Sequence, residues 1–183
     1  LAELYRVYNP FTDVAHKIFE SYLDRFEYNF CFAALEEFTY EVIYLAVLDG
    51  RGPVKVASLP GEITPLHASA LGKAILAYQS PDYIDSFFQN NKPLHRYTKN
   101  TIVEEDILRK QLEEVKINKY ARNDGEFYEE VGAIGVPIFN SKGRVNYAVC
   151  LSYPFILVDE SRIPEIVSLV REIALEMHNR LAF

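Results

Sequence analysis

The sequence predicts an α+β domain with a mostly antiparallel sheet, and three observations lead to this prediction. Segments rich in aromatic and β-branched residues gather in two groups, one in each half of the chain, as is typical of strands. Helical patterns lie before, between and after these two groups. The 183 residues and the 49% hydrophobic content suit one domain with a substantial core.

The N-terminal part is expected to form one helix and then three strands. Apolar side chains recur there at helical spacing, and Thr12 or Asp13 is a suitable N-cap. The segment Asp49-Gly50-Arg51-Gly52-Pro53 is a turn signal before the third strand, so the three strands suggest a β-meander. The expected elements are a helix over residues 12–26 and strands over 30–35, 41–48 and 54–59.

The remaining chain is expected to hold three helices, a hairpin and a long last helix. Pro60-Gly61 interrupts the chain before the first of these helices, in which Gly72 allows close packing on a sheet. Thr101 and Glu104 form a capping signal, and residues 123–125 form a turn. The expected helices cover 68–78, 82–88, 104–118 and 162–181, and the expected strands cover 133–139 and 145–153, joined by a loop at 140–143.

The charge balance excludes some classes of partner. Nineteen basic and 26 acidic residues give a net charge of −7, with an isoelectric point of about 5.2. We therefore expect neither a nucleic-acid surface on this chain nor an anionic membrane as a partner. A small acidic ligand stays compatible with this charge, because one helix terminus binds an anion whatever the net charge.

The two cysteines, Cys31 and Cys150, cannot form a disulfide framework, so we expect reduced core thiols in a cytoplasmic protein. The four histidines have no metal-ligand spacing, and neither a metal nor a cofactor is expected. No apolar run has the length of a membrane span, and neither a membrane span nor a signal peptide is expected. The sequence starts at Leu1 and its one methionine is Met177, so a preceding segment is expected.

The segment TPLHASALGKA, residues 64–74, is the first candidate site. A loop held by Pro65 leads into a helix whose first amide groups have no intrahelical acceptor. With the Ser69 hydroxyl and the His67 imidazole, this arrangement suits a carboxylate. The alternative is that His67 or Thr64 merely caps the helix and that Ser69 is solvated. A phosphate-binding P-loop is rejected, because the required upstream glycine and the Ser/Thr after the lysine are missing.

Two further clusters carry polar chemistry. Asn123-Asp124-Gly125-Glu126, with Glu129 and Glu130, offers carboxylates for a metal or a general base, or else forms a solvated acidic turn. Cys150 and Ser152 point to one face of a strand, where they line a cavity or belong to the core.

These segments together resemble a known family. PLHASALGKAILA, then NDGEF, then AIGVPIFNSKGRVNYAVCLSYP are similar to the C-terminal effector-binding domain of IclR-family transcriptional regulators. The resemblance extends over nearly the whole chain, so residues 1–183 are expected to form this one domain. It implies a GAF-like fold, a curved antiparallel sheet flanked by helices, with a pocket for a small molecule. It also implies an N-terminal winged helix-turn-helix, absent from this sequence, through which a homodimer or homotetramer binds DNA.

The resemblance also implies where an effector binds. One end of the effector would be held at Ser69, Ala70 and Leu71. An acidic position of the family falls at Asn123 or Asp124. The last strand contributes Cys150 and Ser152, and the neutral lining comes from Thr64, Val131 and Ala133.

Three departures from the family pattern make the expected pocket more apolar. Leu71 is bulky where the family often has a small residue, Cys150 replaces a serine-like residue, and Glu130 replaces a glycine. We therefore expect an organic acid or an aromatic compound as effector, but not glyoxylate or pyruvate.

The preferred function is that of a ligand sensor and not of an enzyme. A bound molecule would order the loops at 60–67 and 123–130 and shift an equilibrium between two states of the regulator. A first alternative is a hydrolase in which His67 hydrogen-bonds Ser69 and Asp124 completes a triad, although no G-x-S-x-G elbow surrounds Ser69. A second is a nucleotide-binding or dimerisation module of GAF type, with a pocket filled by its own side chains and an apolar patch elsewhere.

Overall fold

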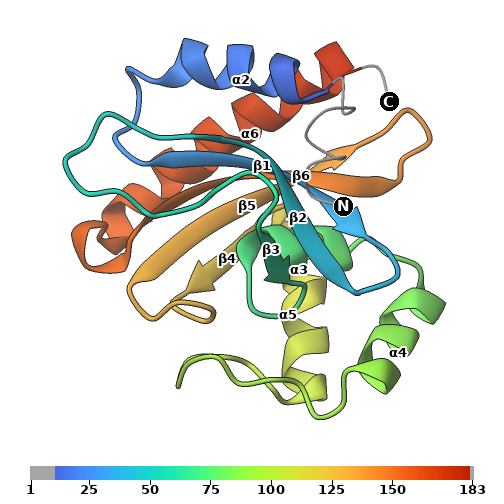
Figure 1. Ribbon diagram of the computed structural model, residues 1–183. Helices are drawn as coiled ribbons and strands as arrows, with labels where there is room; N and C mark the ends of the chain where they lie inside the picture. Colours follow the sequence, from blue (N-terminus) through green and yellow to red (C-terminus); the bar gives the residue numbers. More distant parts are fainter. Residues whose placement is uncertain (1–10, 182–183) are drawn as a thin grey trace.

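The centre of the computed structural model, which describes residues 11–181, is a six-stranded sheet in the order β3-β2-β1-β6-β5-β4 (Figure 1). Every neighbouring pair of strands is antiparallel. Of the domain predicted over 1–183, residues 1–10 and 182–183 lie outside the described part. The strands are β1 Asn29–Glu36, β2 Glu41–Leu48, β3 Ile63–Pro65, β4 Ala121–Asp124, β5 Val131–Phe139 and β6 Val145–Pro154.

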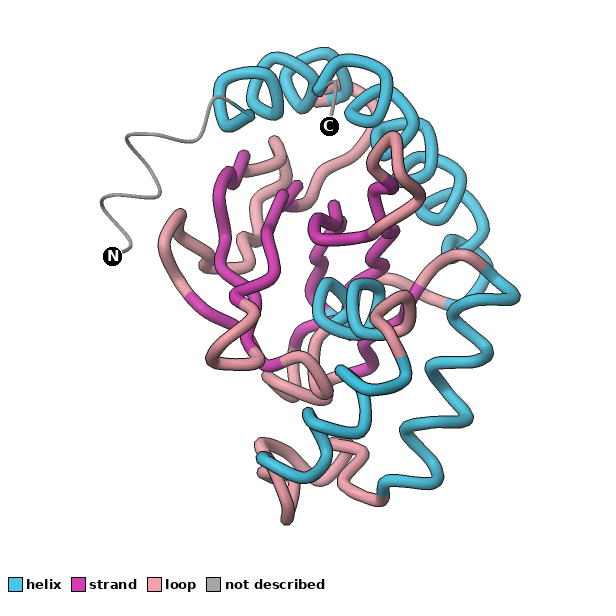
Figure 2. The backbone as a smooth tube through the Cα atoms, turned by 90° about the vertical axis from the view of Figure 1, so that its right-hand side faces the viewer, coloured by secondary structure: helices cyan, strands magenta, loops and turns pink. Residues whose placement is uncertain are grey.

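Helices cover both faces of this sheet. One layer consists of the first and the last helix, and the other contains the helices that lie between β3 and β4 in the chain (Figure 2). Two short 3-10 helices, η1 and η2, lead from β6 to the last helix. The bounds are α2 Phe11–Tyr22, α3 Ala70–Leu76, α4 Pro81–Asn90, α5 Glu105–Asn118, η1 Phe155–Leu157, η2 Glu160–Arg162 and α6 Ile163–Leu181.

Alternation along the central strands gives the two faces different chemistry. Phe30 and Phe32 of β1 pack in the core beneath α2 and α6. Cys31 and Ala33 belong to the core on the opposite face, together with α3. Cys31 lies opposite Cys150 in the register of β1 and β6, so both thiols belong to the α3 face.

Two glycines allow α3 to press closely against its surroundings. A Cβ atom on Gly135 of β5 would lie 2.5 Å from the backbone oxygen of Ala70. A Cβ atom on Gly72 would lie 2.5 Å from the Cα atom of Leu66. Since both distances are far below van der Waals contact, only glycine permits this packing, which brings the start of α3 against β5.

The predicted α+β class, with an antiparallel sheet flanked by helices, is confirmed, but the third strand was placed wrongly. Residues 54–59 form no strand, and the strand that pairs with β2 is β3, Ile63–Pro65. A side chain holds the earlier segment, because Asn29 Nδ2 donates a hydrogen bond of 2.8 Å to the backbone oxygen of Val56. This segment is therefore tied to the start of β1 and does not join the ladder of the sheet.

Three local predictions also need correction. Thr12 and Asp13 lie within α2 and do not precede it as caps. Asn123 and Asp124 end strand β4, and the turn begins at Gly125, whose φ is +72°. The capping signal at Thr101 is wrong because the Thr101 hydroxyl donates to the backbone oxygen of Glu126 at 2.6 Å, and the N-cap residue Glu104 makes no side-chain cap bond.

A membrane-spanning helix was also sought in the described part of the chain. None of the helices there combines the length and the apolar character that crossing a bilayer requires.

Candidate functional site

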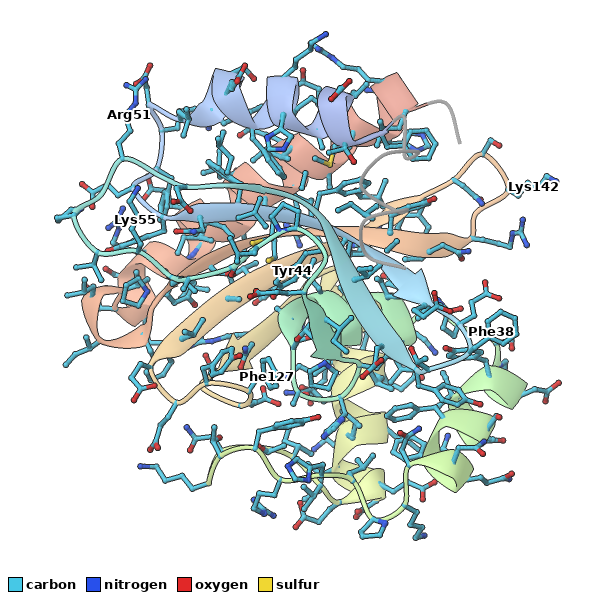
Figure 3. The ribbon with its side chains drawn as sticks, in the orientation of Figure 1. Phe38, Tyr44, Arg51, Lys55, Phe127 and Lys142 are labelled. Atoms are coloured by element: carbon cyan, nitrogen blue, oxygen red, sulfur yellow. The ribbon has the colours of Figure 1, made fainter. Side chains whose placement is uncertain are left out.

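A cavity of about 340 Å³ lies on the face of the sheet that carries α3. Its walls come from β2, β3, β4, β5 and β6, from the start of α3 and from the loops at 56–62 and 127–128. This volume falls in the range of pockets that hold small organic molecules. Tyr44 of β2 and Phe127 of the loop after β4 both line the cavity, and Figure 3 labels both side chains.

Nine of the eleven predicted site residues line this cavity. The sheet and the start of α3 bring together Thr64, Ser69, Ala70, Leu71, Asn123, Val131, Ala133, Cys150 and Ser152. The structure places His67 and Asp124 outside the lining.

Sequence reasoning missed a second set of lining residues, which come from two loops and from β2. The aromatic side chains of Tyr44, Phe127 and Tyr128 belong to this set, as do Ser58 and Glu62. Phe127 and Tyr128 directly follow the NDGE segment, so their position beside a candidate site was the available signal. Ser58 gave no such signal, because it lies in the segment that was assigned to a strand.

Ser69 is the N-cap of α3. Its hydroxyl donates to the backbone oxygen of Pro65 at 2.8 Å and accepts from the amide of Gly72 at 3.0 Å. The alternative in which another residue caps the helix and Ser69 is solvated is therefore wrong, since Ser69 is buried and is itself the cap. The first helical amide bond runs from Lys73 to the Ser69 carbonyl, so the amides of Ala70 and Leu71 precede it at the cavity wall.

His67 faces a different part of the molecule. Its Nε2 donates to the backbone oxygen of His95 at 2.9 Å, and its ring lies near those of Phe87 and Tyr97. Burial lowers the pKa of His67, which keeps the imidazole neutral. His67 and Ser69 form no hydrogen bond with each other, so the pairing that the hydrolase alternative predicted is contradicted.

Asp124 takes part in a surface ion pair. One of its carboxylate oxygens lies 2.5 Å from Nε of Arg122, and the same guanidinium pairs with Glu160. The proposed triad therefore has no geometric basis, because its three members face three different partners.

Asn123 and the loop after it are held together by several bonds. The Glu126 amide donates to Oδ1 of Asn123 at 2.8 Å. The Glu126 carboxylate forms an ion pair with Lys73 of α3, and both side chains are buried. Glu129 pairs with Lys99 at the surface. The acidic cluster is thus divided among separate partners, and within residues 11–181 no group of three or more His, Cys, Asp or Glu side chains is arranged to hold a metal ion.

Cys150 lines the cavity, and Cys31 lies opposite it in the register of β1 and β6. Cys150 Sγ lies 3.6 Å from Oγ of Ser152, and both cysteines are free. The hydrogen bond with Cys150, together with burial, raises the pKa of Cys31 well above its usual value. A protonated thiol is a weak nucleophile, so Cys31 is not suited to covalent chemistry.

Comparisons with known proteins agree with this architecture. Residues 12–179 match the family model described as bacterial transcriptional regulator IclR C-terminal. The DNA-binding transcriptional repressor YiaJ of Escherichia coli (strain K12) is 29% identical over 133 residues, which are 72% of this chain and 47% of YiaJ. The chain spans about half the length of the curated relatives that it matches.

Solved structures share the same fold. The IclR protein of Thermotoga maritima aligns with a TM-score of 0.90 and 23% identity, over 100% of this chain and 72% of that protein. A double mutant of the PobR inducer-binding domain from Acinetobacter, in complex with 3-hydroxybenzoic acid, aligns with a TM-score of 0.82 and 24% identity, over 92% of this chain and 97% of that domain. Because the family model covers residues 12–179, this chain belongs to the IclR family of bacterial transcriptional regulators and contains the C-terminal domain of that family.

Proposed function

We propose that this domain binds a small organic effector in the 340 Å³ cavity and takes no part in chemical catalysis. The cavity itself carries the proposal, because segments from most strands of the sheet converge on it beside the start of α3. Three aromatic side chains in its wall suit an organic acid with an aromatic or apolar body. The 3-hydroxybenzoic acid bound by the PobR domain belongs to that chemical class, which supports the same choice here.

The site lacks an arranged nucleophile and base. The Ser69 hydroxyl is committed to the Pro65 carbonyl, and the His67 imidazole to the His95 carbonyl. The dimerisation alternative requires a pocket that is filled by its own side chains. The unfilled volume of about 340 Å³ argues against that alternative. In the whole regulator, the proposed role of this domain is to shift a cytoplasmic homodimer or homotetramer between states with different affinity for DNA, through an N-terminal DNA-binding domain.

Titration calorimetry of the wild-type chain with 3-hydroxybenzoate, benzoate and phenylacetate tests this proposal. We expect at least one of these acids to bind with one-to-one stoichiometry. The matched variant is Ala133→Phe, in which a buried alanine of the lining is enlarged so that the ring occupies the cavity. This variant should fold, as judged by circular dichroism, and should not bind the acid.

Absence of binding by all three acids would overturn the proposal. Hydrolysis of 4-nitrophenyl acetate that Ser69→Ala and His67→Gln both abolish would favour the hydrolase instead.

A further inference from the structure

A second cavity, of about 260 Å³, lies beside the loop that joins α4 to α5. Its walls come from the start of β2 and the turn before it, from Pro65 and His67, and from the end of α4 and the loop after it up to Tyr97. Among the residues that the structure describes, none lines both this second cavity and the effector cavity, the 340 Å³ cavity of the proposed function. The second cavity is therefore a separate candidate site.

Five aromatic rings follow one another along the second cavity. Neighbouring ring centroids lie between 4.5 and 6.4 Å apart in the series Tyr40, Phe87, His67, Tyr97 and His95. Phe87 and His67 are buried, whereas Tyr97 is 41% exposed and Tyr40 is half-buried. The face of a tyrosine ring attracts a cation, so the two tyrosines suit a positively charged group.

Glu41 is the one acidic residue in the described lining of the second cavity. Within residues 11–181 its carboxylate has no hydrogen bond or ion pair. Burial raises the pKa of Tyr97, and the negative charge of Glu41 raises it further, so the carboxylate acts on this ring. The lysine of the lining, Lys92, has its own counter-charge in Glu105 at 3.6 Å. An unpaired carboxylate beside accessible tyrosine rings is complementary to an organic cation.

Two asparagines of the same lining have engaged donors and free acceptors. Asn90 Nδ2 donates to the backbone oxygen of Ser86 at 2.8 Å, and Asn91 Nδ2 donates to the backbone oxygen of Phe87 at 2.8 Å. Because a carbonyl only accepts, each bond identifies the nitrogen end of the amide group and thereby the oxygen end. No donor to either Oδ1 is found in the described part of the chain. The lining therefore favours a ligand group that only donates, as an ammonium group does.

We propose that the second cavity binds a small organic cation that carries an ammonium group. Tyr40 and Tyr97 would contact the cation, Glu41 would balance its charge, and the Oδ1 atoms of Asn90 and Asn91 would accept its N–H groups. A carboxylate ligand would instead meet the charge of Glu41. The proposal does not rest on the proposed function, because the two cavities share no described lining residue.

The test is an NMR titration of the ¹⁵N-labelled wild-type chain at about pH 8 with three probes that carry the same alkyl chain, butylammonium, 1-butanol and butyrate. We expect butylammonium to bind at least about tenfold more tightly than either of the others. It should shift the backbone amide signals of Asn90, Asn91 and Tyr97. The signals of Ala70 and Ala133, which line the effector cavity, should stay in place.

Glu41→Gln keeps the length of the side chain and removes its charge. We expect this variant to bind butylammonium at least about tenfold more weakly than the wild type and to bind 1-butanol equally well. Glu36→Gln is the matched control, because Glu36 lies opposite Glu41 in the register of β1 and β2 but does not line the second cavity. It should change the affinity for butylammonium by less than about twofold, since solvent and salt screen more distant charges.

Three outcomes would overturn the proposal. One is that the wild type binds butylammonium no more tightly than 1-butanol, a result that does not depend on the folding of any variant. Another is that the signal shifts are confined to the effector cavity. The third is that Glu36→Gln loses as much affinity as Glu41→Gln, because net charge alone would then account for the binding. None of these outcomes concerns the binding of acids in the effector cavity, so the proposed function is tested separately.

Discussion

Lys73 of α3 is completely buried and forms an ion pair with Glu126, which lies 53 positions later in the loop after β4. Leu71 lies two residues before Lys73, and Phe127 directly follows Glu126, and both of these neighbours line the cavity. The ion pair therefore links two walls of the cavity. Burial lowers the pKa of Lys73 and raises the pKa of Glu126, so each charge depends on the other.

Removing one partner of this pair should destabilise the chain strongly. Lys73→Met leaves the Glu126 carboxylate buried without a counter-charge, and we expect a loss of about 3–5 kcal/mol in the free energy of unfolding. The double variant Lys73→Met/Glu126→Gln should lose less than the single variant, because no uncompensated charge remains. Urea unfolding of both variants measures this difference.

The control is Lys99→Met, which breaks the exposed pair between Lys99 and Glu129. Its stability should stay close to that of the wild type, because solvent screens such pairs. A double variant as unstable as Lys73→Met would contradict the expected coupling.

Gly135→Ala should disturb the packing of α3 against β5 of the sheet. The new Cβ atom would meet the Ala70 backbone oxygen at 2.5 Å, so the start of α3 must move away from β5. We expect a loss of about 1–3 kcal/mol in the free energy of unfolding, as for other overpacked sites. Urea unfolding measures it, with the exposed hairpin variant Ser141→Ala as the control, which should match the wild type.

Acid should weaken the fold in part through His67. Because burial lowers the pKa of His67 below its usual 6.5, the unfolded chain binds a proton there at a pH where the folded chain does not. The contribution of His67 is therefore complete above the usual pKa of 6.5 and is lost as the pH falls from there through the lowered value. The slope for this one group reaches at most about 1.4 kcal/mol per pH unit.

His67→Gln should show a smaller fall in the free energy of unfolding between about pH 7.5 and about pH 5.5 than the wild type shows. Ser141→Ala, which changes no titratable group, should keep the wild-type slope. Equal slopes in wild type and His67→Gln would show that other groups govern the acid sensitivity.

Cys31 should react slowly while the chain is folded. It is fully buried, and the hydrogen bond with Cys150 and its burial raise its pKa well above the usual value, so little thiolate forms. We expect iodoacetamide at about pH 8 to leave Cys31 unmodified in native protein within the time that it modifies this residue in urea. Mass spectrometry counts the modified residues, and rapid native modification of Cys31 would contradict this account.

Local patterns in the sequence determined most elements of the fold. The apolar residues at helical spacing on both sides of residue 170 predicted α6, and the aromatic and β-branched segments predicted β1, β2, β5 and β6. Burying one face of a helix or strand requires apolar residues at the spacing of that element, so the pattern is visible in the sequence. The resemblance of the HASALGK and CLS segments to the IclR family implied Ser69, Cys150 and Ser152 as effector-binding residues, and the structure brings them together in one cavity wall.

Tertiary structure decided what each polar group contacts. His67 and Ser69 are near neighbours in the chain, yet one faces the His95 carbonyl and the other caps α3. Asn123 and Asp124 are adjacent in β4, and strand alternation sends only Asn123 into the cavity. The sequence alone predicted the clusters of residues that surround the site. Contacts between residues far apart in the chain, such as Lys73 and Glu126, decided which atoms face the cavity. Such contacts depend on packing between elements and not on local spacing, so the sequence pattern did not predict them.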